Sequence, residues 1–155
     1  MAIRPEEKFE NVRRSVINYI EANYTLTAKD FAGSKGLDTT TIDEWVWFGF
    51  TGTTARRFMR HSEPTAHGDL VQYLLNVVIS KVISDDIAGI DRIRDTVVNL
   101  LRRTTIQVVD YADTQANLGK IVGQGILSEG HIEAENDVPR YSLIFLLQYI
   151  EEYDR

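Results

Sequence analysis

The feature that most constrains the fold is a long alternation of side-chain types between positions 68 and 84, GDLVQYLLNVVISKVIS. Apolar or aromatic residues occupy every second position from Val71 to Ile79, and again Ile83. This alternation, rich in β-branched residues, predicts a strand with one buried face and one half-buried face. Residues 71–83 would span roughly 43 Å at about 3.3 Å per residue, about twice the length of an ordinary strand. We therefore expect the strand to protrude, to bend sharply or to pair with another chain.

Composition places the chain among soluble globular proteins. Its 155 residues are 43% hydrophobic and 26% charged, which suits one domain spanning residues 1–155. No apolar run is long enough for a membrane span, and MAIRPEEKFE does not have the pattern of a signal peptide. The absence of cysteine excludes disulfides, thiolate metal sites and cysteine nucleophiles. A net charge of −6 argues against broad binding of nucleic-acid phosphates, although DNA could pass nearby without being held.

Two amphipathic helices are predicted, at residues 5–21 and 87–103, because apolar residues recur there at helical spacing. Their buried stripes consist of Phe9, Val12, Val16, Ile17 and Ile20 in the first helix and Ile90, Ile93, Val97, Leu100 and Leu101 in the second. Between residues 23 and 41 the pattern weakens. We interpret this stretch as a long ordered loop with at most one helical turn near residues 28–32.

Further strands are predicted at residues 43–60, 104–111, 121–128 and 140–153, with a loop at 112–120 and a turn through SEGHIEAEND. The element order is therefore α-β-β-α-β-β-β. This order favours the α+β class, with a mostly antiparallel twisted sheet of long strands and two helices packed on one face.

The strand that begins near residue 43 is apolar on both faces. Trp45 and Trp47 share one parity, while Phe48 and Phe50 share the other, and Gly49 and Gly52 favour a bulge or a close backbone approach. Such a strand is buried on both sides or presents an aromatic surface to a partner. Three arginines follow, and arginine suits bidentate contacts with acidic groups of a neighbouring subunit. The candidate subunit or tube interface is thus Trp45, Trp47, Phe48, Phe50, Arg56, Arg57 and Arg60.

Catalytic motifs are not found. The chain has no G-x-S-x-G elbow, and GFTGTT at residues 49–54 lacks the G-K-[ST] of a phosphate-binding loop. Two groups have metal-ligand chemistry: His61, Glu63, His67 and Asp69, and His131, Glu133 and Glu135. Solvated polar turns and a solvated acidic face account for both more simply. We predict no catalytic, cofactor-binding or metal-binding residue, no cofactor and no enzymatic activity.

The order of elements, with WVWFGFTG, LVQYLLNVVISKVIS, IDRIRDTVVNLLRR and YSLIFLLQYIEEY as its main segments, resembles the tail terminator (tail completion) proteins of long-tailed bacteriophages. The resemblance implies a virion structural protein, assembled in the host cytoplasm, whose copies form a ring that is commonly hexameric. Such a ring caps the tail tube and meets the head–tail connector, so the implied partners are the protein itself, the tube protein and the connector protein. DNA would pass through without specific binding, and no membrane is involved.

The resemblance also gives the acidic stretch near residue 130 a role. A negative lumen would repel DNA and let it slide. The candidate lumen face is Glu129, Glu133, Glu135 and Asp137.

Three alternatives stay open at this point. Another phage neck or tail-tube component would share the long strands, but a tube subunit would form open-ended tubes on its own. A small metal-dependent hydrolase would require a bound divalent metal at one of the two histidine groups. A bacterial adaptor domain would bind a peptide by strand addition and remain monomeric or dimeric until its partner arrives.

Overall fold

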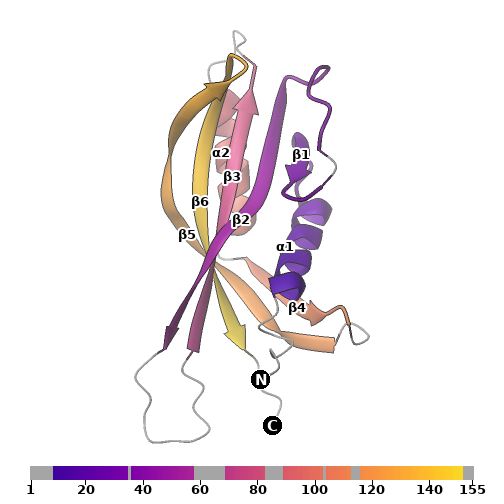
Figure 1. The fold of residues 1–155 in the computed structure, drawn as a ribbon, viewed down its shortest axis with the longest axis vertical. Helices are drawn as coiled ribbons and strands as arrows, with labels where there is room; N and C mark the ends of the chain where they lie inside the picture. The colour runs from indigo at the N-terminus through magenta and orange to yellow at the C-terminus, as the bar shows by residue number, and fades with distance from the viewer. Residues whose placement is uncertain are drawn as a thin grey trace, which may run out of the picture.

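A computed structural model of the protein describes residues 9–34, 36–57, 69–82, 89–102, 104–112 and 116–151. Its helices are α1 (Phe9–Asn23) and α2 (Gly89–Leu101), and its strands are β1 (Ala28–Phe31), β2 (Glu44–Arg57), β3 (Asp69–Lys81), β4 (Thr105–Asp110), β5 (Ala116–Glu135) and β6 (Val138–Glu151). The strands form one sheet in the order β1-β2-β3-β6-β5-β4, which twists strongly along its length (Figure 1). The predicted α+β class is confirmed. Neither described helix has the length and hydrophobicity needed to cross a membrane.

The stretch predicted as a loop at residues 23–41 contains a strand, β1. It pairs parallel to β2, with Ala28 opposite Trp45 and Phe31 opposite Phe48. Lys29 Nζ donates hydrogen bonds to the carbonyl oxygens of Glu21 and Tyr24 at 2.8 and 2.7 Å, which fixes β1 beside the end of α1. Four residues are too few for alternation to be visible, so the prediction of a loop with a helical turn was wrong for this segment.

Strand β5 is much longer than predicted. It has 20 residues and includes most of the segment predicted as a turn. Its pairing with β6 shifts register at three places, between Gly123 and Gly125, between Ile126 and Ser128 and between Ile132 and Glu135. Each bulge changes which parity faces the core, so the alternation that identifies a strand is lost. The turn itself is Asn136–Asp137, whose φ angles of 51° and 64° are those of a type I′ hairpin turn.

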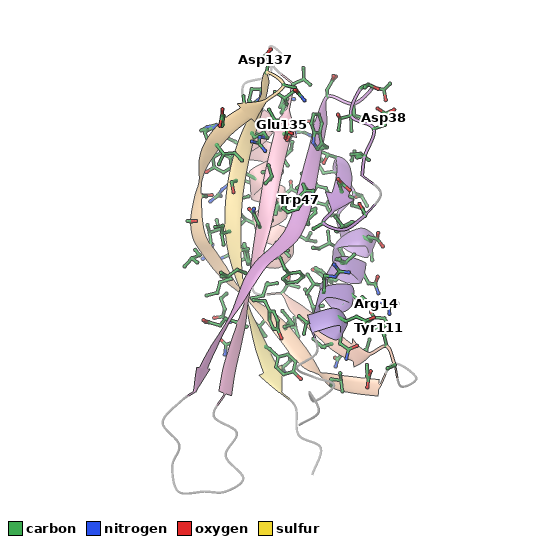
Figure 2. All side chains as sticks on the ribbon, viewed as in Figure 1. Arg14, Asp38, Trp47, Tyr111, Glu135 and Asp137 are labelled. Atoms are coloured by element: carbon green, nitrogen blue, oxygen red, sulfur yellow. The ribbon has the colours of Figure 1, made fainter. Side chains whose placement is uncertain are left out.

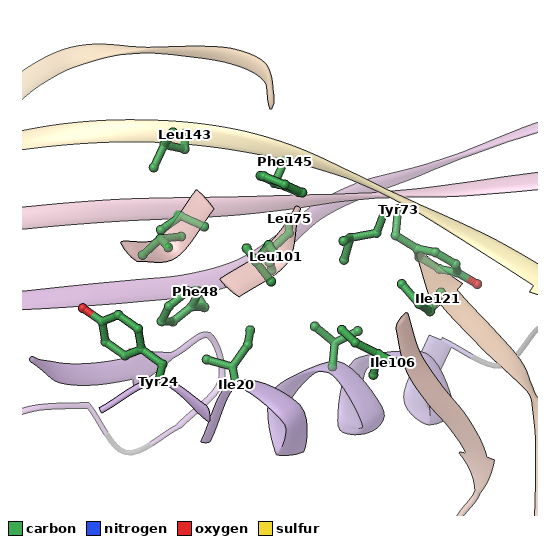
Figure 3. Packing of buried hydrophobic residues seen from close by; sticks show 14 of the residues in the cluster. Ile20, Tyr24, Phe48, Tyr73, Leu75, Leu101, Ile106, Ile121, Leu143 and Phe145 are labelled. Carbon is green, nitrogen blue, oxygen red and sulfur yellow. The ribbon is translucent and has the colours of Figure 1, made fainter. Parts of the chain in front are cut away.

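Both helices pack on one face of the sheet, as predicted. The core joins side chains from both helices with the inward-facing parity of the strands, including Val12, Val16 and Ile20 of α1, Ile93, Val97 and Leu101 of α2, and Phe48, Leu75, Ile106, Ile121, Leu143 and Phe145 of the sheet. Figure 3 shows Phe48 directed toward Tyr24 and Ile20, and the Tyr24 and Phe48 ring centroids are 5.7 Å apart. Burial of these side chains supplies the main stabilisation of the fold.

The β4 edge of the sheet is covered by polar side chains of α1. The amide of Val109 donates to Ser15 Oγ at 3.3 Å, and the amide of Tyr111 donates to Asn11 Oδ1 at 3.2 Å. Asn11 and Ser15 are themselves buried. Nearby, the Arg14 guanidinium lies 4.1 Å from the centroid of the Tyr111 ring (Figure 2). Unpaired amides at a sheet edge invite pairing with other chains, and α1 blocks that pairing here.

Candidate interaction surface

The sheet face opposite the helices carries an aromatic surface built by cross-strand pairs. Trp47 lies opposite Val78, and Trp45 lies opposite Ser80. Ser80 is in turn opposite Arg140 of β6. Residues opposite each other in a sheet share a face, so these side chains form adjoining rows across β2, β3 and β6. Both tryptophans are half-buried.

A groove of about 350 Å³ lies on this face. The loop after β1, the sheet and the end of the β5–β6 hairpin form its walls, through Asp30, Leu37, Thr39, Trp45, Trp47, Val78, Ser80, Glu135 and Arg140. Figure 2 shows Trp47 on β2 and Glu135 near the hairpin end. Arg140 Nη1 lies 3.4 Å from Glu135 Oε2, and Arg140 Nε donates to the carbonyl oxygen of Glu133 at 2.9 Å. The groove thus combines two indole rings with two carboxylates and one guanidinium that already has partners.

The Trp47 ring is positioned by a glycine two residues later. A Cβ atom on Gly49 would lie 2.4 Å from Trp47 Cη2 and 2.9 Å from Ala32 Cβ. Because Gly49 has no side chain, the Trp47 indole ring can pack directly against the strand backbone at this point. The glycine therefore allows the close approach that the sequence predicted, and it sets the orientation of the groove's main aromatic ring. The predicted bulge is also present, between Phe50 and Gly52.

The other predicted interface residues divide between the two faces and the far end of β2. Phe48 is 1% exposed and lies in the core, so its assignment to an interface was wrong. Phe50 is half-buried at the edge of the core, with its ring centroid 6.2 Å from that of Tyr73. Arg56 and Arg57 are the last two residues of β2, and Arg60 lies outside the described residues. The two apolar faces of β2 thus have different roles, because one is core and the other lines the groove.

The four predicted lumen carboxylates do not share one face. Glu129 lies opposite the buried Leu143, so it is on the helix side of the sheet. There its carboxylate accepts two hydrogen bonds from Arg94 of α2, at 3.0 Å from Nε and 2.9 Å from Nη2. These bonds hold the pKa of Glu129 below its ordinary value. Glu135 instead lines the groove on the opposite side. The predicted single acidic face is therefore wrong, although all four residues are exposed.

The candidate metal ligands are not clustered where the structure describes them. Within the described ranges, no three His, Asp or Glu side chains come together in a way that could hold a metal ion. The His131 ring packs edge-on against Tyr141, with centroids 5.0 Å apart. Burial raises the pKa of the Tyr141 hydroxyl, and the nearby Glu129 carboxylate raises it further. His61, Glu63 and His67 lie outside the described residues.

Comparison with known proteins finds similarity in structure alone. No protein-family model matches the chain, and no curated protein sequence matches it. A solved structure whose name states no function superimposes with a TM-score of 0.64 at 8% identity, covering 96% of this chain and 99% of the other. A chain in the virion of a native gene transfer agent particle superimposes with a TM-score of 0.55 at 17% identity, covering 89% of this chain and 93% of the other. At these identities the likeness shows a shared fold.

Proposed function

We propose that the protein is a virion structural protein that acts as a tail terminator, a subunit whose copies form a ring on the end of a phage tail tube. The observation that carries this proposal is the fold shared with a chain of the gene transfer agent virion over nearly the whole length of both chains. A fold alone hosts many functions, so the aromatic groove adds needed support. Half-buried tryptophans on the sheet face away from the helices are typical of the centre of a protein–protein interface.

In this proposal the ring caps the tube, ends its polymerisation and presents a surface to the head–tail connector. The partners are other copies of the chain, the tube protein and the connector protein. DNA passes through the ring without sequence-specific contacts, which suits a chain with a net charge of −6.

The experiment that tests this function is the mass of the purified protein by light scattering, followed by negative-stain imaging with and without purified tail tubes. We expect closed rings, or caps on tube ends that stop further growth. Open-ended tubes formed by the protein alone would reassign it as a tube subunit. A protein that forms neither rings nor caps in the presence of tubes would contradict the proposal.

A further inference from the structure

The outermost strands of the sheet, β1 and β4, have edges that the chain itself closes. At β1 the Phe31 amide donates to Asp30 Oδ1 at 2.9 Å, and the Phe31 carbonyl oxygen accepts from the Ser34 amide at 3.0 Å. Beside β4, side-chain oxygens of α1 accept hydrogen bonds from the Val109 and Tyr111 amides. Natural sheets protect their edges in such ways, because unpaired backbone groups recruit further strands.

Two inner strands have long edges that no described strand covers. β1 pairs only with residues 45–48 of β2, so residues 50–57 of β2 have a described strand, β3, on one side alone. β4 pairs only with residues 116–122 of β5, so residues 124–135 have β6 on one side and no described strand on the other. We call residues 50–57 the β2 edge and residues 124–135 the β5 edge. Figure 1 shows the β5 edge toward the top of the molecule and the β2 edge toward the bottom.

The register shows where the backbone groups of the β5 edge point. The Ala32 amide donates to the Phe48 carbonyl oxygen at 2.9 Å, so Phe48 directs its backbone groups toward β1 and away from β3. Opposite residues of antiparallel strands direct these groups either toward each other or both away. Phe48 lies opposite Val77, and Val77 lies opposite Leu143. Leu143 lies opposite Glu129, so the Glu129 amide and carbonyl point away from β6.

The same alternation identifies further outward amides on both edges. His131 follows Glu129 by two residues within a run of unshifted register, residues 128–132, so its amide also points away from β6. On β3, Val71 has the parity of Val77 and directs its groups toward β6. Ala55 lies opposite Val71, so the Ala55 amide points away from β3.

Exposure and charge indicate which strand would fit the β5 edge. From Leu127 to Glu135 every residue except Gly130 is exposed, and Leu127 and Ile132 are apolar side chains with 60% and 39% exposure. The β5 edge contains three glutamates and no lysine or arginine, whereas the β2 edge contains two arginines and no carboxylate. A second β5 edge would bring like charges together, and a β2 edge would bring opposite charges.

We propose that the β5 edge of one copy pairs antiparallel with the β2 edge of the next copy. β2 and β5 run in opposite directions, because each step from β2 through β3 and β6 to β5 is antiparallel. Copies related by rotation about an axis along the strands therefore meet in this antiparallel arrangement. The runs of unshifted register that meet, residues 128–132 and 52–57, are similar in length. This inference rests on the proposed function, since it names the contact that joins subunits within the ring.

The contact joins two different edges and is therefore heterologous. Each copy has one β2 edge and one β5 edge on opposite sides of the sheet, so every added copy leaves one of each for the next. Such contacts close into rings when the rotation between copies allows it. Because the two edges lie at opposite ends of the strands, neighbouring copies are staggered along the strand direction. Closed sheets accommodate a stagger by tilting their strands relative to the ring axis.

The test removes one outward amide from each edge in full-length protein. Proline has no backbone N–H and is tolerated in a strand where that N–H does not pair within the sheet. His131→Pro therefore blocks the β5 edge, and Ala55→Pro blocks the β2 edge. The matched controls keep the amide: His131→Ala loses the same ring contact with Tyr141, and Ala55→Ser changes the same position of β2.

Circular dichroism checks that each variant is folded. If a proline variant does not fold, Ile132→Lys replaces His131→Pro and Ala55→Asp replaces Ala55→Pro, because each gives its edge a charge like that of the partner edge. In analytical ultracentrifugation the wild type and both controls should assemble, and each blocked variant alone should sediment as a monomer. The two blocked variants mixed in equal amounts should form a complex of twice the monomer mass and nothing larger, because one intact pair of edges remains between them.

Each other outcome decides against a specific statement. A blocked variant that dimerises alone would show that identical edges pair, which overturns the inference. A wild type or a mixture that stays monomeric at the highest soluble concentration would overturn it as well. If the mixture dimerises but the wild type caps no tubes, the contact stands and the terminator function fails. If the wild type and both blocked variants cap tubes, the function stands and this contact is overturned.

Discussion

At the scale of single residues, Gly123 lies where an added side chain would meet the backbone of another element. A Cβ atom there would lie 1.7 Å from the carbonyl oxygen of Leu101, the last residue of α2, and the Gly123 amide donates to the Thr104 carbonyl at 3.0 Å. We expect Gly123→Ala to lower the free energy of unfolding by about 1–3 kcal/mol, as overpacking of a close contact does. Urea unfolding of the variant and the wild type measures this loss of free energy. Gly130→Ala is the control, because nothing lies within 4 Å of a Cβ there; equal losses in both would show that strand propensity, and not the contact with α2, is responsible.

The Arg94–Glu129 ion pair gives a prediction with a defined pH dependence. Hydrogen bonds from Arg94 lower the pKa of Glu129 below its ordinary value of 4.5 in the folded state. Its stabilisation is therefore fully present above about pH 4.5 and is lost as the pH falls through the lowered folded-state pKa. The pair is partly exposed, so its coupling should not exceed about 1 kcal/mol. A double-mutant cycle with Arg94→Ala and Glu129→Gln, measured by urea unfolding at several pH values, checks this. A coupling that persists unchanged in acid would contradict it.

At the scale of elements, the docking of α1 on the β4 edge predicts a difference between two asparagines of one helix. Asn11→Ala removes the buried oxygen that accepts from the Tyr111 amide at 3.2 Å. We expect a loss of about 1–2 kcal/mol, because the partly buried Tyr111 amide would lose its acceptor. Asn18→Ala removes an exposed bond to the Tyr111 hydroxyl and should cost about 0.5 kcal/mol or less. Thermal unfolding compares the two, and faster hydrogen exchange at the Tyr111 amide in Asn11→Ala alone would localise the effect. Equal destabilisation by both would argue that this edge is not sealed by Asn11.

The same elements explain what could be predicted from the sequence. Strands β2, β3 and β6 were recognisable because long stretches of each keep one parity toward the core, and the helices because their apolar residues recur at helical spacing. Most of strand β5 was not predicted, because its bulges change that parity. Strand β1 is too short to show a pattern. The hydrogen bonds that Ser15 makes to Val109 of β4 and Asn11 to Tyr111 just after it join residues about a hundred positions apart, and no local pattern in a single sequence encodes them.

At the scale of the whole molecule, the candidate surface was predictable only in part. The sequence indicated that β2 is apolar on both faces, but parity alone does not say which face is core. The helices decide this by covering the face of Phe48, which leaves Trp45 and Trp47 on the other. Alternation likewise fails to place the acidic residues on one face or the other. Glu129 and Glu135 lie on opposite faces because a bulge separates them, and the sequence does not reveal this bulge.

This division of β2 between core and surface leads to a paired prediction for neighbouring residues. Phe48→Asp should prevent folding, because Phe48 is 1% exposed and packs against Tyr24 and Phe31 at ring-centroid distances of 5.7 Å in both cases. An unpaired carboxylate in that environment has no compensating partner. Trp47→Asp should leave a folded subunit, because Trp47 is half-buried beside a groove that solvent can enter.

Circular dichroism separates folded from unfolded variants, and light scattering with negative-stain imaging then reports rings and tube caps. A folded Trp47→Asp subunit that still forms rings and caps would exclude the groove from the interface. A Trp47→Asp variant that cannot fold would assign both faces of β2 to the core, and the exposed Leu127 on β5 would then be the candidate for the subunit contact.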